Sequence, residues 1–139
     1  MRRFEFKLGR VREFRHMLEE KAKQELQETQ RRVIEAEAEL QAIIDHRRDS
    51  LREAFRSVTD RLSMQAYINR LDEAIATQES IIAIIKQDEE FARERWLEVR
   101  QDAEVMDKLH ETAHEEYVAE ANREEQNELD EWATRRRAA

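Results

Sequence analysis

A regular series of apolar residues between Met64 and Met106 constrains the fold of this chain more than any other feature. Its members are spaced alternately three and four residues apart: Ile68, Leu71, Ile75, Gln78, Ile82, Ile85, Glu89, Ala92, Trp96, Val99, Ala103 and Met106. Only Gln78 and Glu89 are not apolar, and the residues between the members are mostly charged or Gln. This spacing puts the apolar side chains on one narrow stripe of a helix, as in a coiled coil. Such a stripe needs a partner helix to cover it.

The composition supports an all-α fold. One glycine, no proline and 6% aromatic residues leave little for sheets or tight turns, and 42% of the residues are charged. In ordinary globular domains only about 25% of the residues are charged. The sustained heptads argue against disorder, so we predict a single coiled-coil domain over residues 1–139. No apolar run approaches the roughly 18 residues of a membrane span, and no signal peptide or cysteine is present, so we expect a cytoplasmic protein.

A second apolar series predicts a first helix over about residues 7–57. It runs Val11, Phe14, Leu18, Ala22, Leu26, Val33, Ala36, Leu40, Ile43, Leu51, Ala54 and Val58. With Thr29 and Arg47 as polar members, the spacing averages about 3.6 residues, the period of a nearly straight helix. Before it, Phe4, Phe6 and Leu8 alternate with charged residues. This segment is either a short extended arm or the first turns of the helix.

The phase of the apolar pattern changes in the Ser-rich segment from Ser57 to Ser63. Ser, Thr and Asp side chains compete with the helical backbone for hydrogen bonds, so we predict a turn at about 58–62. The second helix then spans about 63–135, with Ser63 as its N-cap, or begins a turn earlier at Thr59 or Asp60. The alternative is one continuous helix that must dimerise.

The charge distribution favours an antiparallel hairpin with a longer second helix. The net charge is −8, but residues 1–15 carry six cations against two acids, whereas residues 102–131 carry twelve acids against two cations. Folding near residue 60 brings these stretches together and places Phe4 near Tyr117, and residues beyond about 118 extend as a single helix. Because the chain is not uniformly basic, we expect no nucleic acid as a partner.

No site chemistry emerges from the motifs. His110 to His114 reads H-E-x-x-H, the pattern of zinc proteases. A catalytic zinc also needs a third ligand and a cleft, so we interpret the motif as a solvated helix face. There is no P-loop, nucleophile elbow or glycine-rich phosphate cradle. We therefore expect no enzymatic activity, no cofactor and no metal.

Two apolar features leave alternatives open. Ile81 and Ile84 widen the stripe around Ile82 and Ile85, either as a thicker seam or as an exposed docking patch. Trp132 lies on the predicted overhang, where it either anchors an interface or packs on neighbouring turns of its own helix. The basic N-terminus with its phenylalanines is also compatible with an anionic membrane surface, but the acids of the second helix offer an internal partner.

Several segments, in order, resemble the FliJ family of the bacterial flagellar type III export apparatus. They are Phe4-x-Phe6-x-Leu8, the A-E-A-E-L-Q-A-I-I-D run from Ala36 to Asp45, the Y-I-N-R-L-D-E-A-I run from Tyr67 to Ile75, and the charged tail from Asn122 to Ala133. The absence of a glycine at the turn and the presence of Gly9 in the first helix depart from the family pattern. The resemblance implies a non-enzymatic cytoplasmic stalk, peripheral at the inner membrane. It also implies three partners: the flagellar export ATPase, the export gate membrane protein and the export chaperones.

The resemblance also implies two contact surfaces. The surface for the export gate would consist of Ile43, His46, Tyr67, Leu71, Ala74 and Gln78. The surface for the ATPase ring would consist of Phe4, Phe6, Leu8, Val11, Phe14, Tyr117 and Trp132. The alternatives are the equivalent stalk of a virulence type III secretion system and a generic coiled-coil spacer that dimerises through the isoleucine stripe.

Overall fold

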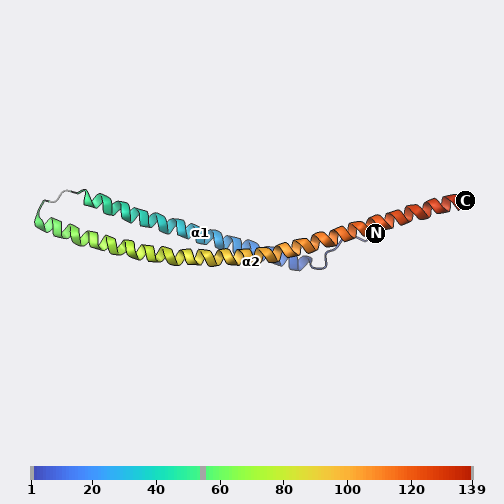
Figure 1. Ribbon diagram of the computed structural model, residues 1–139, viewed down its shortest axis with the longest axis horizontal. Coiled ribbons are helices and arrows are strands. Elements are labelled where there is room, and N and C mark those ends of the chain that lie inside the picture. Colours follow the sequence, from blue (N-terminus) through green and yellow to red (C-terminus); the bar gives the residue numbers. More distant parts are fainter. Residues whose placement is uncertain (1, 54–55, 139) are drawn as a thin grey trace. The chain divides into compact units, whose positions relative to one another are not determined.

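The chain contains two long helices. The structure is a computed structural model and describes residues 2–53 and 56–138. Helix α1 spans Gly9–Leu51 and helix α2 spans Val58–Ala138 (Figure 1). No strand occurs within residues 2–53 and 56–138, so the prediction of an all-α fold with a longer second helix is confirmed. The same residues include no helix with a stretch long and apolar enough to cross a membrane.

Both helices run through two compact units. The first, the middle unit, comprises Ala22–Trp96. The second, the terminal unit, comprises the residues up to Lys21 and those from Leu97 onward.

In the middle unit, α1 and α2 pair in antiparallel orientation. Ion pairs join Arg32 to Asp88, Glu37 to Lys86 and Arg47 to Asp72, so the partner's number falls as the number along α1 rises. Each such exposed pair contributes only about 0–1 kcal/mol. Apolar burial therefore supplies most of the stability. The buried apolar side chains of this unit are Ala22, Leu26, Val33 and Ala36 of α1 and Ile68 and Ile82 of α2.

The apolar stripe predicted for the second helix is confirmed, since every member from Ile68 to Met106 is buried or half-buried. Its polar member Gln78 is buried as well. The Gln78 amide donates hydrogen bonds to the Ala36 carbonyl at 3.0 Å and to the Glu39 carboxylate at 3.2 Å. A buried polar residue in a coiled-coil seam costs stability but fixes the register of the two helices.

The terminal unit is also antiparallel, with Arg12 paired to Asp107 and Arg15 to Asp102. The predicted antiparallel coiled-coil hairpin and the contact between its basic and acidic stretches are therefore confirmed. The apolar series predicts that Val11 and Phe14, in the first turns of α1, face α2. This is wrong, because both side chains are exposed. Arg12 and His16 turn toward α2 instead, because both form hydrogen bonds with Asp107.

The predicted helix ends, 7–57 and 63–135, require correction. Helix α1 ends at Leu51, and α2 begins at Val58 because Ser57 caps it. The Ser57 hydroxyl accepts a hydrogen bond from the Asp60 N–H at 3.1 Å, and the Ser57 carbonyl accepts one from the Arg61 N–H at 3.1 Å. Asp60 also places a negative charge at the positive end of the helix. Ser63 lies inside α2, and predicted helix member Ala54 lies outside the described residues.

At the N-terminus, residues 2–8 form the arm that was one of the two alternatives for this segment. The Gly9 N–H donates to the Phe6 carbonyl at 3.1 Å, and the Arg12 N–H donates to the Leu8 carbonyl at 2.9 Å. Helix α1 therefore starts at Gly9, where the glycine lies at the helix end rather than inside.

Candidate functional site

The arm of residues 2–8 packs on α2 through an aromatic cluster. The cluster consists of Phe4, Phe6, His110, His114 and Tyr117. The Phe4 ring centroid lies 5.6 Å from that of His110, 5.1 Å from that of His114 and 5.3 Å from that of Tyr117. The Phe6 ring lies 5.2 Å from that of His110. The Tyr117 hydroxyl donates a hydrogen bond to the Arg2 carbonyl at 2.7 Å. The predicted proximity of Phe4 and Tyr117 is confirmed.

The spacing of the two sequences explains this fit. Alternate residues of an extended chain are about 6.6 Å apart, and residues four apart on a helix rise by about 6 Å. Phe4 and Phe6 therefore match the repeat of His110 and His114. The contacts with His110 and His114 are edge-to-face, at 77°, 90° and 85° between ring planes. Such pairs contribute about 0.5–1.5 kcal/mol each beyond their buried area.

These contacts correct the interpretation of H-E-x-x-H as a solvated helix face. His110 is half-buried, and both imidazoles lie against phenylalanine rings rather than only water. No group of three or more His, Cys, Asp or Glu side chains in the described residues could hold a metal ion. The two histidines of the motif therefore hold the arm.

An open groove of about 1230 Å³ lies between the arm and α2. Phe4, Phe6, Ala113 and Tyr117 give it an apolar floor. The arm and α2 line it with opposite net charge, since the arm contributes two arginines, a lysine and one glutamate while α2 contributes three glutamates. The charged residues that line the groove are Arg2, Arg3, Glu5 and Lys7 of the arm and Glu116, Glu120 and Glu124 of α2.

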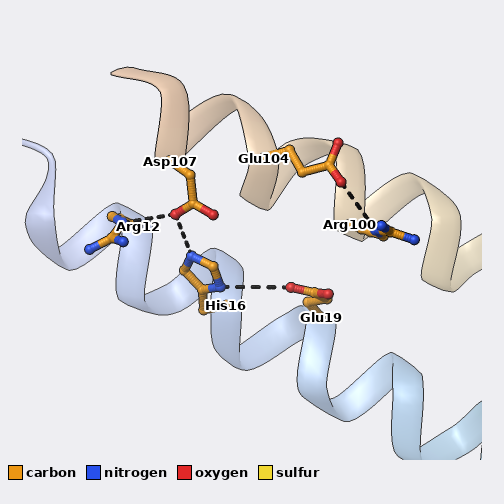
Figure 2. Close-up of polar contacts among 6 residues, drawn as sticks. All are labelled: Arg12, His16, Glu19, Arg100, Glu104 and Asp107. Atoms are coloured by element: carbon orange, nitrogen blue, oxygen red, sulfur yellow. Dashed lines mark hydrogen bonds and ion pairs between the residues drawn. The ribbon is translucent and has the colours of Figure 1, made fainter. Parts of the chain in front are cut away.

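Asp107 holds the first turns of α1 on α2 (Figure 2). One oxygen of this carboxylate lies 2.9 Å from Arg12 Nε and 2.6 Å from His16 Nε2. The other ring nitrogen of His16 faces the Glu19 carboxylate at 3.7 Å. The hydrogen bond from His16 and, next, that from Arg12 lower the pKa of Asp107 below its usual value. We call Arg12, His16, Glu19 and Asp107 the Asp107 junction.

The residues of the expected export-gate surface lie together in the middle unit, with different exposure. His46 and Tyr67 are exposed and hydrogen-bonded to each other, and their rings meet edge-to-face at 5.8 Å and 88°. Ile43, Leu71 and Ala74 are half-buried at the seam. Gln78 is buried. The accessible part of this surface is therefore the His46–Tyr67 pair.

The remaining expected contact residues lie in the terminal unit. Leu8 and Trp132 are exposed, and the Arg136 guanidinium lies 5.0 Å from the centre of the Trp132 ring. Trp132 is thus partly covered by the next turn of its own helix and still accessible. In the middle unit, Ile81 and Ile84 are exposed rather than part of a thicker seam.

Sequence reasoning did not find the histidine contacts. The sequence predicts a solvated helix face for His110 and His114, an export-gate contact for His46 and no role for His16. Their partners in the structure are Phe4, Phe6, Tyr67 and Asp107. The available signal was the antiparallel alignment itself, which sets aromatic or acidic residues opposite each histidine.

One of three comparisons with known proteins identifies a family. A family model described as the flagellar FliJ protein matches residues 4–139. Comparison with curated proteins gave no match, and neither did comparison with solved structures. Since the family match covers nearly the whole chain, including the arm, both helices and the overhang, the chain belongs to the FliJ family and is a component of the flagellar export apparatus.

Proposed function

We propose that the chain is a non-enzymatic stalk that associates with the ring of the flagellar export ATPase and links it to the membrane export gate and to export chaperones. The observation that carries this proposal is the family match over residues 4–139. Each helix satisfies its own backbone hydrogen bonds, so a helix pair can present separate surfaces along its length without a globular core.

The ATPase contact is assigned to the terminal unit. The aromatic cluster joins the arm to α2, so that the N-terminal arm and residues 110–117 contribute to one surface. Exposed Leu8, Val11, Phe14 and Trp132 supply apolar anchors, and aromatic anchors of this kind dominate the energy of many interfaces. The charged edges of the groove add orientation and association rate more than affinity.

The gate contact is assigned to the His46–Tyr67 pair in the middle unit. Both rings are exposed and hold each other in one orientation through a hydrogen bond and an edge-to-face contact. A side chain that is already ordered loses less conformational entropy on binding. The pair is therefore a better anchor than two free side chains would be.

The test is a titration of the full chain against the flagellar export ATPase of the same organism, scored by ring formation and hydrolysis rate. We expect stimulation by the wild-type chain and at least a tenfold weaker half-maximal effect for Phe4→Ala. The matched control Phe91→Ala changes an exposed phenylalanine of the middle unit and is expected to behave as wild type.

Three outcomes separate the candidates. Stimulation lost with Phe4→Ala and kept with Phe91→Ala supports the terminal contact. No binding by the folded, helical chain contradicts the stalk and supports a spacer. Stimulation of only the ATPase of a virulence secretion system would assign the stalk to that system instead.

A further inference from the structure

One side of the helix pair in the terminal unit carries apolar side chains that neither helix covers. We call it the apolar face, and it consists of Val11, Phe14 and Leu18 of α1 and Val105, Met106 and Leu109 of α2. Val11 and Phe14 are 40% and 51% exposed, and Val105 and Leu109 are 53% and 44% exposed. Leu18 and Met106, between them, are half-buried.

An ion pair shows that the two sets of side chains lie on the same side. Successive residues of a helix are about 100° apart, so Phe14 lies nearly opposite His16 around α1, and Val105 lies nearly opposite Asp107 around α2. Because His16 and Asp107 meet on one side of the helix pair, at 2.6 Å, Phe14 and Val105 lie together on the other side. Residues three and four apart are neighbours on a helix, so Val11 and Leu18 share the side of Phe14, and Leu109 shares the side of Val105.

The two outer edges of the apolar face have opposite charge at the same level. Lys21 follows Phe14 by seven residues and so extends the α1 edge, whereas Glu98 precedes Val105 by seven residues and extends the α2 edge. The pairing of Arg12 with Asp107 and of Arg15 with Asp102 puts Lys21 level with Glu98. Neither residue forms an ion pair in the described part of the chain.

We propose that the apolar face binds a second copy of this chain, forming a parallel homodimer with its two-fold axis along the helices. In this arrangement α1 of each copy lies on α2 of the other, so Phe14 meets Val105 of the second copy and Val11 meets Leu109. Lys21 meets Glu98 of the second copy, and the symmetry forms each contact twice. In this dimer the face thus pairs apolar side chains with apolar side chains, and the positive Lys21 with the negative Glu98.

The proposed dimer is weak. Four half-exposed apolar side chains per copy make an interface near or below the lower limit of about 1,200 Å² for stable complexes. We therefore expect a dissociation constant on the order of 10–100 µM. The dimer covers Val11 and Phe14. If the proposed ATPase contact holds, the dimer is a resting form that the ATPase displaces; only this consequence rests on the proposed function.

The test uses the purified full chain alone, by sedimentation equilibrium from about 1 to 500 µM at low ionic strength. We expect a reversible monomer–dimer equilibrium. Phe14→Glu should weaken it at least tenfold, because it buries a charge in the apolar face. Phe91→Glu changes an equally exposed phenylalanine of the middle unit, at 59%, and should shift the equilibrium less than twofold. Circular dichroism checks that both variants keep wild-type helicity.

A charge exchange tests the arrangement. Lys21→Glu and Glu98→Lys should each weaken the homodimer, and a mixture of the two variants should form heterodimers more tightly than either forms homodimers. A chain that stays monomeric to about 500 µM overturns the proposal. So does a dimer that Phe91→Glu weakens and Phe14→Glu does not, or a mixture with no gain over the separate variants. None of these outcomes bears on stimulation of the ATPase.

Discussion

At the scale of single residues, polar contacts replace apolar packing where α1 begins. Val11 and Phe14 are exposed, and Arg12 and His16 contact Asp107 of α2. These side chains are more than a third exposed, so solvent screens the interaction and limits it to about 1 kcal/mol. The first turns of α1 are therefore held less firmly than the apolar seam of the middle unit.

The lowered pKa of Asp107 predicts a pH-dependent contribution. A carboxylate whose pKa is lower in the folded state stabilises the fold above its unfolded pKa and loses that contribution as the pH falls through its folded pKa. We expect Asp107→Asn to lower the free energy of unfolding at pH 7 by about 0.5–1 kcal/mol, and the difference from wild type to disappear as the pH falls through the lowered pKa of Asp107. Thermal unfolding of both proteins at several pH values, followed by circular dichroism, measures this difference in stability.

Asp88→Asn is the matched control, since among the residues that the structure describes Asp88 meets only Arg32, at 4.0 Å. Its effect at pH 7 should be smaller. An Asp107→Asn difference that persists unchanged in acid would show that the loss comes from packing rather than from the charge.

At the scale of elements, periodicity predicted the seam of α2 because burial alone decides which side chains lie there. It did not predict the helix ends, because those depend on hydrogen bonds of single side chains. The sequence from Ser57 to Asp60 contains the S-x-x-D pattern of a helix start, but Ser63 offered an equally plausible cap one and a half turns later. The hydroxyl of Ser57, which bonds the Asp60 N–H, distinguishes them.

The observed cap predicts opposite effects for two similar substitutions. Ser57→Ala removes the acceptor for the Asp60 N–H and should destabilise the chain by about 1 kcal/mol. Ser63→Ala places a better helix former at an exposed position inside α2 and should be neutral or stabilising by a few tenths of a kcal/mol. Urea unfolding of both variants checks this. If Ser63→Ala were the more destabilising, the helix would begin near residue 63.

At the scale of the whole molecule, the sequence was sufficient for the antiparallel pairing and insufficient for the contact residues. Opposite charge at residues 1–15 and 102–131 selected the alignment, and several weak pairs act together on it. The arm was less determined by the sequence: Phe4 and Phe6 contact α2 from a segment that precedes the start of α1 at Gly9. The alternation of Phe4, Phe6 and Leu8 with charged residues is compatible with an extended arm and with the first turns of a helix. The packing of Phe4 and Phe6 on α2 stabilises the arm.

The aromatic cluster predicts how the N-terminal arm is retained on α2. Phe4→Ala removes three ring contacts, and a loss of about 1.5–3 kcal/mol makes the released arm roughly 10- to 100-fold more populated. Cleavage at sites within the arm follows the population of the released form when opening is fast. Limited trypsin digestion should therefore cut after Arg3 and Lys7 at least tenfold faster than in wild type, by mass spectrometry. Phe91→Ala, on the middle unit, should leave that rate unchanged. Equal rates for wild type and Phe4→Ala would mean that the hydrogen bond from Tyr117 to the Arg2 carbonyl and the turn at Gly9 hold the arm without the rings.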